Sequence, residues 1–186
     1  MLHLVDNKLS FSSIAIAGIG GAGCNMVQRH RHGVLYRVQM QVQHLAVNTD
    51  RSAIVRIQGM PAILLNADAS GVEAVMPWLA QCKALYLLAG LGGYAGSTAT
   101  PALARRARDA GLHTVAVMGM PCDWEGRRRR TTALRALESV REHAAETFVV
   151  HGDAVAERLG EGASIGEFIE GINSWLLREL DARMAL

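Results

Sequence analysis

The chain has 186 residues, of which half are hydrophobic and 19% are charged, as expected for one soluble domain with a full core. A formal net charge of +2 is too small to indicate nucleic-acid binding by itself, so we expect no nucleic-acid partner. Three cysteines without CxxC spacing indicate a reduced, cytoplasmic protein, and no apolar run reaches the ~18 residues of a membrane span.

Short apolar runs alternate with amphipathic stretches along the chain. The runs predict six buried strands, at Ser13–Ile19, His44–Asn48, Ala62–Leu65, Ala84–Ala89, His113–Met118 and Thr147–His151. The stretches between them predict helices at Cys24–His32, Arg51–Ile57, Ser70–Gln81, Ser97–Ala110, Gly126–Ala144, Asp153–Leu159 and Ser164–Leu180. Ser70 and Ser164 each precede a glutamate by three residues, the capping-box spacing of a helix start.

This alternation predicts an α/β fold of three layers, in which a parallel sheet is covered by helices on both faces. The doubly wound, Rossmann-like topology with strand order 3-2-1-4-5-6 is favoured. No boundary is visible within residues 1–186, so we expect a single domain that ends in a long core helix. Trp78 and Trp175 fall at helical positions typical of core packing, Trp124 is also expected to pack, and His30 is expected on the surface.

Two glycine-rich segments each follow a predicted strand and open a helix. The first, Gly18–Asn25, fits the GxGxxG dinucleotide spacing, and taken alone it also fits glycines that only allow close packing of strand and helix. The second, Ala89–Pro101, follows the strand expected next to the first. Because helix N-termini bind phosphates through backbone N–H groups, the pair predicts one cradle for a string of phosphates rather than a NAD site.

At these residues the chain resembles FtsZ, the bacterial tubulin-like cell-division GTPase, in its nucleotide-binding half. Five segments of the family's sequence are matched here. They are the GVGGGGNN loop at Gly18–Asn25, the AVNTD segment at Ala46–Asp50, the tubulin signature at Gly90–Pro101, the KPFNFEGKKR segment at Met120–Arg129 and the LGRGISLLDAFGAAND segment at Leu159–Ser174. The match to the tubulin signature is imperfect. The matches keep their order over residues 13–180.

The resemblance implies that the chain binds GTP or GDP, with or without Mg²⁺. It implies a site without catalytic or metal-ligating residues, in which the phosphates are held by Gly20, Gly21, Ala22, Gly92, Gly93, Gly96 and Ser97. Asn25 would face the nucleotide, Glu125 and Arg129 would contact the ribose, and Asn173 would reach the base edge. Asn48 and Asp50 would lie at the rim of the same cleft.

Several positions depart from the family pattern. Tyr94, Ala95 and Thr98 replace a glycine, a threonine and a glycine of the phosphate loop, and a tyrosine at a positive φ would be strained. The loop after the third strand is reduced to Asn66–Ser70. The family's guanine-reading carboxylate falls on Ser174, and its base-packing aromatic falls on Ile169, with Phe168 one residue off register.

The family continues from its central helix into a hydrolysis loop and a second domain, whereas this sequence ends at Leu186. We therefore expect a guanine-nucleotide-binding, FtsZ-like protein that neither hydrolyses GTP nor polymerises alone and that caps a full-length FtsZ-like polymer. The other expected partner is a second copy, through an uncovered face of the last helix at Trp175, Leu176, Leu177 and Leu180.

Two other interpretations stay open. A nucleotide-free interaction module on the same fold is favoured by Tyr94, Ala95 and the short loop after the third strand. A NAD-dependent enzyme is less favoured, because no set of catalytic acids and bases follows the first glycine loop.

Overall fold

The computed structural model describes residues 13–33 and 41–184, which form six parallel strands and the helices that cover them. The strands are β1 (Ser13–Ile19), β2 (Val42–Asn48), β3 (Ala62–Leu64), β4 (Cys82–Gly90), β5 (His113–Met120) and β6 (Glu146–His151). Their order is β3-β2-β1-β4-β5-β6, with every neighbouring pair parallel. This confirms the three-layer, doubly wound sheet expected from the alternation of apolar runs.

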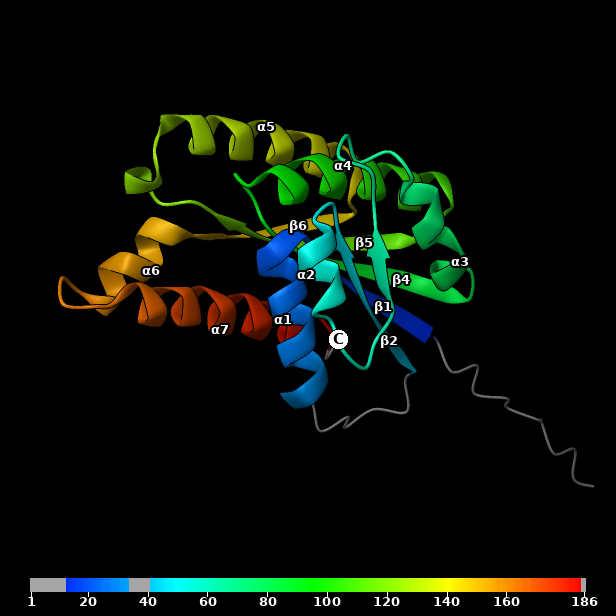
Figure 1. Ribbon diagram of the computed structural model, residues 1–186, viewed down its shortest axis with the longest axis horizontal. Coiled ribbons are helices and arrows are strands. Elements are labelled where there is room, and N and C mark those ends of the chain that lie inside the picture. The colour runs from blue at the N-terminus through cyan, green and yellow to red at the C-terminus, as the bar shows by residue number, and fades with distance from the viewer. Residues whose placement is uncertain (1–12, 34–40, 185–186) are drawn as a thin grey trace, which may run out of the picture.

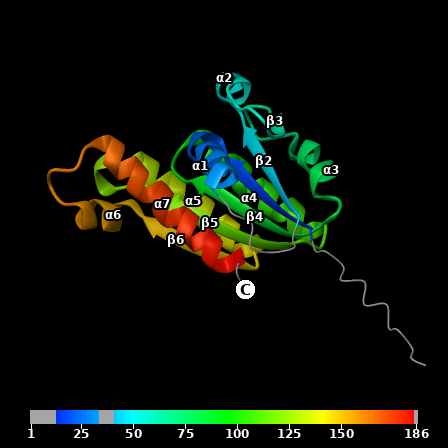
Figure 2. The ribbon, with the colours of Figure 1, turned by 90° about the horizontal axis from the view of Figure 1, so that it is seen from below.

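The helices are α1 (Gly20–Gly33), α2 (Arg51–Val55), α3 (Met76–Leu79), α4 (Tyr94–Asp109), α5 (Arg127–His143), α6 (Gly152–Leu159) and α7 (Ile165–Met184). Two 3-10 turns, η1 (Val72–Val75) and η2 (Asp123–Glu125), precede α3 and α5. Figures 1 and 2 show α3, α4 and α5 on one face of the sheet and α1 and α7 on the other. Among the described residues, no helix has both the length and the apolarity to cross a lipid bilayer.

Two hydrophobic cores lie on the two faces of the sheet, and β1 contributes to both. Ala15, Ala17 and Ile19 belong to the core under α3, α4 and α5, whereas Ile14 and Ile16 belong to the core under α1 and α7. Every residue of β1 is buried. A strand covered on both faces has no polar side, which is why it is a continuous apolar run in the sequence.

Helices α1 and α4 begin earlier than the sequence indicates, inside the glycine clusters at Gly20 and Tyr94. A Cβ atom on Gly23 would lie 2.3 Å from the Leu88 carbonyl oxygen, and one on Gly96 would lie 2.3 Å from that of Gly90. These glycines therefore let the first helical turn pack directly on the end of a strand. The helix starts predicted at Cys24 and Ser97 therefore come a turn too late.

The single helix expected from Ser70 is wrong, and only the short pieces η1 and α3 form. The Ser70 hydroxyl accepts a hydrogen bond from Asn66 Nδ2 at 2.9 Å, and Gly71 at the start of η1 has a φ of 91°. Such local bonds of serine compete with helix capping. At Ser164 the expected capping box forms, because its Oγ accepts from Glu167 N at 3.2 Å and its N donates to Glu167 Oε2 at 2.9 Å.

Helix α7 buries the apolar face that we expected to be open. Leu176 and Leu180 are fully packed in the core that α7 shares with β5, β6 and α6, while Trp175 and Leu177 pack partly against it. The interpretation of Leu176 and Leu180 as surface for a second copy is therefore wrong. The sheet itself covers these leucines, since α7 lies across it (Figure 2).

The predicted surface position of His30 is also wrong, because its ring is buried between three elements. His30 Nδ1 lies 2.9 Å from His44 Nε2 of β2, and His30 Nε2 lies 3.2 Å from Asp181 Oδ1 of α7. Burial lowers the pKa of both rings, and that of His44 falls to about 4. This small polar network joins α1, β2 and α7 within an otherwise apolar layer.

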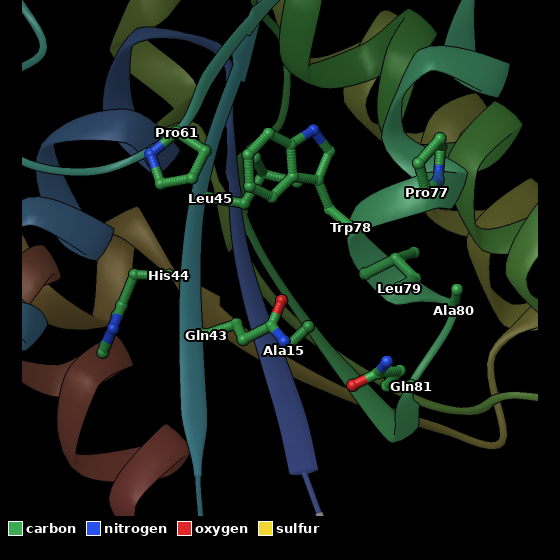
Figure 3. A pocket seen from close by; sticks show the side chains of 10 residues that line it. All are labelled: Ala15, Gln43, His44, Leu45, Pro61, Pro77, Trp78, Leu79, Ala80 and Gln81. Carbon is green, nitrogen blue, oxygen red and sulfur yellow. The ribbon is translucent and has the colours of Figure 1, made fainter.

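Trp78 does not enter the core as predicted; 46% of its surface is exposed. It borders a cavity of about 400 Å³ at the edge of the sheet where the strands begin. Figure 3 shows its ring directed from α3 towards Leu45 and Pro61, with the amides of Gln43 and Gln81 below. This cavity lies at the opposite edge of the sheet from the glycine-rich segments.

Candidate functional site

A cavity of about 600 Å³ opens where β1, β4 and β5 end and α1 and α4 begin. Helix α7 provides the wall opposite the glycine-rich helix starts, and η2 and the start of α5 provide a third side. Of the residues predicted for the site, those that line the cavity are Gly20, Gly21, Ala22, Asn25, Gly93, Gly96, Glu125, Arg129 and Asn173. These residues lie far apart in the sequence, and the fold brings them around one space.

The first turns of α1 and α4 meet at one end of the cavity. A Cβ on Gly20 would lie 2.9 Å from the backbone nitrogen of Gly96, so the two backbones are nearly in contact. Open space lies where a Cβ would extend from Gly21 and Gly93. Because the first N–H groups of a helix have no partner within it, this end presents backbone donors and two positive dipole ends to the cavity.

Gly92 and Ser97 shape this end without lining the cavity. Gly92 has a φ of 93°, and its N–H donates to Ser97 Oγ at 2.8 Å. The Ser97 N–H in turn donates to the Gly93 carbonyl oxygen at 3.1 Å. The pair therefore fixes the turn that leads β4 into α4.

Tyr94 is the first residue of α4 and lines the cavity with 62% of its surface exposed. Among the described residues Ala69 alone, glycines aside, has a positive φ. The strain anticipated for a tyrosine at this position is therefore absent, because the helical conformation of residue 94 accepts any side chain.

Glu125 and Arg129 form an ordered pair on the side of the cavity. One Glu125 oxygen accepts from the Cys122 N–H at 2.9 Å, and the other lies 3.2 Å from Arg129 Nε. The carboxylate is mostly buried, whereas half of the guanidinium surface is exposed. The pair thus offers a fixed acceptor and a cationic donor toward the middle of the cavity.

Helix α7 presents Asn173 among apolar side chains at the other end. Asn173 is 7% exposed, and its amide makes no hydrogen bond to another described side chain or backbone group. Phe168, Ile169 and Ile172 line the same wall. Trp124 contacts the edge of the Phe168 ring, with centroids 5.7 Å apart, yet it is 65% exposed, so its expected packing is only partial.

Asn48 and Asp50 lie outside the cavity lining and organise the turn between β2 and α2. The Asn48 side-chain oxygen accepts from the N–H groups of Thr49 at 2.8 Å and Asp50 at 3.2 Å. Asp50 caps α2 by accepting from the Ser52 N–H and hydroxyl, both at 2.8 Å. These bonds from Ser52 hold the pKa of Asp50 below its usual range.

The sequence prediction missed several apolar members of the site. Ile165 and Ile172 of α7 line the cavity. Leu91, Met120 and Pro121 also line it, at the ends of β4 and β5. Ile165, Phe168, Ile169 and Ile172 follow helical spacing and share one face of α7. That periodicity was the signal available for the α7 wall.

Metal ligands are scarce around the cavity. Over residues 13–33 and 41–184, no group of three or more histidine, cysteine, aspartate or glutamate side chains converges as a metal site. Glu125 is the one carboxylate among the described lining residues.

A family model and several known proteins are similar to this chain. Residues 68–159 match the family described as Tubulin/FtsZ family, GTPase domain. The chain is FtsZ-like. Cell division protein FtsZ of Aquifex aeolicus (strain VF5) is 29% identical over 177 residues, which cover 88% of this chain and 48% of that protein. The Haloferax mediterranei FtsZ is 30% identical over 164 residues, which cover 81% and 44%.

Solved structures share the fold of this FtsZ-like chain. The empty FtsZ dimer of M. jannaschii superposes with a TM-score of 0.82 at 21% identity and covers 91% of this chain and 53% of that one. CetZ2 from Haloferax volcanii, described as a GTPγS-bound protofilament, gives 0.77 at 22% identity and covers 93% and 58%. The chain spans about half the length of the curated relatives it matches.

Proposed function

We propose that this FtsZ-like chain binds guanine nucleotides, GTP or GDP, in the 600 Å³ cavity. The observation that carries the proposal is the meeting of two glycine-rich helix starts at one end of a cavity whose other end is apolar around a buried amide. Backbone N–H groups and helix dipoles suit a polyphosphate, and an apolar slot with one amide suits a base. No single residue of this set would be enough to indicate a nucleotide site.

Individual roles follow from these positions. In the proposed complex Gly20, Gly21 and Ala22 of α1 and Gly93 and Gly96 of α4 receive the phosphates. Asn25 lies on α1 one turn further on, and Glu125 and Arg129 lie between the two ends, where a ribose would sit. Gly92 and Ser97 support the site by fixing the turn between β4 and α4. Asn48 and Asp50 support it by fixing the turn between β2 and α2.

A magnesium ion that accompanies the nucleotide would depend on the phosphates for its ligands. Mg²⁺ prefers carboxylate, phosphate and water oxygens. Glu125, the single carboxylate of the described lining, is already bound to the Cys122 N–H and paired with Arg129. We therefore assign no residue of the described chain to the metal.

The 186-residue chain is proposed not to hydrolyse GTP by itself. Phosphoryl transfer to water needs a residue that orients or deprotonates the attacking water. Glu125 is tied to its two partners, the Cys122 N–H and Arg129. Histidine and aspartate are absent from the described lining.

The cellular role is proposed from the relatives, which are named cell division proteins. We propose that the chain works in the cytoplasm, where its three buried, unpaired cysteines would stay reduced. The exposed Tyr94, Trp124, Ile165 and Ile169 surround the cavity mouth. Such an apolar rim fits a modulator that places this face against a subunit of an FtsZ-like polymer.

A nucleotide-free interaction module is the second candidate. It is favoured by Tyr94, whose exposed side chain stands at the phosphate end and replaces the glycine of the family pattern. In that case the same rim would bind a protein partner and the cavity would stay without nucleotide.

Calorimetric titration with GDP and GTP distinguishes the two candidates. The informative variant is Gly21→Leu, because open space lies where its side chain would extend and it would fill the phosphate end without disturbing the core. Gly162→Leu is the matched control, since it has equal room in the loop after α6. We expect binding to the native chain and to the control and at least tenfold weaker binding to Gly21→Leu. No heat and no thermal shift at millimolar nucleotide would favour the interaction module.

A further inference from the structure

An ion pair between Arg29 and Glu170 joins α1 and α7, two helices of the candidate site. Arg29 Nη1 donates to Glu170 Oε2 at 2.6 Å, and Arg29 Nη2 donates to Glu170 Oε1, so both oxygens of the carboxylate are held. The bonds from Arg29 hold the pKa of the Glu170 carboxyl below its usual range. A two-point contact of this kind fixes the relative orientation of the two side chains as well as their distance.

The ion pair lies in a groove between α1 and α7 that adjoins the main cavity. Arg29 and Glu170 both line this groove. Asn25 of α1 and Ile169 and Asn173 of α7 line the groove and the main cavity alike. Because three residues border both spaces, the groove meets the cavity along its α7 wall. The ion pair therefore bridges a side opening of the cavity.

The part of α7 that forms the cavity wall has this one side-chain tie to α1 within the described residues. Glu170 lies inside the stretch 165–173 that contributes the wall. The other side-chain bond between the two helices joins His30 to Asp181, roughly 16 Å further along the axis of α7. His30 and Asp181 line neither the cavity nor the groove. Close to the site, the position of α7 against α1 thus depends on Arg29 and Glu170.

Both members of the ion pair are accessible to water. The side chain of Arg29 is 46% exposed and that of Glu170 is 53% exposed. An exposed ion pair contributes little to the stability of the fold, and dissolved salt weakens it. The contact can consequently open and close while the hydrophobic core under α7 stays packed.

We propose that the Arg29–Glu170 ion pair is a latch, which retains a nucleotide in the main cavity and must open before the nucleotide leaves through the groove. The inference rests on the proposed nucleotide binding and adds to it the determinant of nucleotide release. Arg29 and Glu170 do not line the main cavity, so they are positioning residues that act through the α7 wall. Loss of the latch frees this wall from α1 and speeds dissociation.

The test measures the dissociation rate of fluorescent N-methylanthraniloyl-GDP from the full chain, chased with excess unlabelled GDP. Glu170→Gln keeps the size of the side chain and removes its charge, and we expect release to become about three- to fivefold faster, the effect of an exposed ion pair. Raising NaCl from about 0.05 M to about 0.5 M should speed release from the native chain by a similar factor, because salt screens the pair. Glu170→Gln should respond little to the same change.

The chain offers a matched control and a reversal. Glu73→Gln breaks the Arg106–Glu73 ion pair between η1 and α4, which has an N–O distance of 2.6 Å, similar exposure and no place in the cavity or the groove. Its release rate should equal that of the native chain. Exchange of the charges by Arg29→Glu with Glu170→Arg rebuilds the pair in reverse and should restore slow release. A defect of folding or packing at position 170 would not be repaired by this exchange.

Each result decides a different point. A release rate that stays at the native value in folded Glu170→Gln, that the exchanged pair does not restore, or that Glu73→Gln raises equally overturns the latch. If Glu170→Gln does not fold by circular dichroism, Arg29→Lys replaces it, because lysine keeps the charge and loses the two-point contact. An intermediate rate in that variant supports the latch, and an unchanged rate overturns it. Absence of binding of both the analogue and GDP to the native chain rejects the proposed function itself.

Discussion

The two edges of the parallel sheet each carry a cavity bordered by an exposed tryptophan, but only one has the chemistry of a ligand site. At the edge where the strands end, Trp124 stands beside two helix N-termini, an ion pair and a buried amide. At the edge where the strands begin, Trp78 stands among prolines, leucines and glutamine amides. Helices of an α/β unit start where strands end, so their positive dipole ends gather on one side.

The largest expected effect comes from the packing of the glycine edge. Gly96→Ala places a Cβ 2.3 Å from the Gly90 carbonyl oxygen, so the start of α4 must shift. We expect a loss of about 3 kcal/mol in the free energy of unfolding and loss of nucleotide binding, measured by urea denaturation and calorimetry. Gly162→Ala, with no atom near its Cβ, serves as the control. Equal stability of the two variants would mean that the close approach of α4 to β4 is wrong.

The second effect separates the two edges by function. Arg129→Ala removes the cationic donor beside Glu125 and should weaken nucleotide binding by about 1.5–3 kcal/mol, the contribution of a charged hydrogen bond. Trp78→Ala at the opposite edge should leave the affinity unchanged. Calorimetric titration of both variants measures this. A larger loss of affinity for Trp78→Ala than for Arg129→Ala would place the ligand at the edge where the strands begin and contradict the proposed site.

A third effect concerns pH and the His30–His44 pair near the edge where the strands begin. Folding lowers the pKa of His44 from 6.5 to about 4, mainly through burial, so the unfolded chain binds the proton more tightly. Stability is therefore full above pH 6.5 and is lost as the pH falls from 6.5 toward 4. We expect a loss of roughly 1–3 kcal/mol from this group by pH 4, because the ring is buried and solvent screens it little.

Urea denaturation of the native chain and of His44→Gln at a series of pH values measures this contribution. The glutamine does not titrate, so its stability should fall less steeply between pH 6.5 and 4. Parallel curves for the two proteins would show that His44 is not the group responsible.

The smallest effect compares two serines with the same sequence spacing. Ser164→Ala removes the capping box of α7 and should cost about 0.5–1 kcal/mol in unfolding free energy. Ser70→Ala removes bonds to the exposed side chains of Asn66 and Asp68 and should cost less. Thermal melting of the two variants checks the order. A larger loss at Ser70 would contradict the structure of the segment before α3.

The fold was predictable from the sequence to a large extent because its signals are local. The six apolar runs gave the strands to within a few residues at each end, and right-handed crossovers left the observed strand order as the favoured one. Most of the lining of the cavity was also predictable, since Gly20–Asn25 and Gly93–Gly96 each follow a strand directly. Two glycine clusters at neighbouring strand ends must meet in any such sheet.

Other features depended on local side-chain bonds and turns that the residue pattern does not reveal. Ser70 and Ser164 have the same spacing to a glutamate, but Asn66, Gly71 and Pro77 redirect the first segment into short turns. Asn48 and Asp50 end a strand at the predicted edge, yet their side chains turn into local backbone bonds and away from the cavity. Residue type alone does not distinguish a ligand-binding amide from one that closes its own turn.

The sequence by itself determined the parallel sheet, its strand order and the glycine-rich end of the cavity, because periodicity and glycine placement act over a few residues. Only the tertiary structure decided that Leu176 and Leu180 are core, that His30 is buried between β2 and α7, and that Asn173 faces the cavity without a partner. The physical reason is that α7 has apolar residues on more than one side. The helix lies across β5 and β6 and against α6. This placement decides which side of α7 the sheet covers and which side lines the cavity.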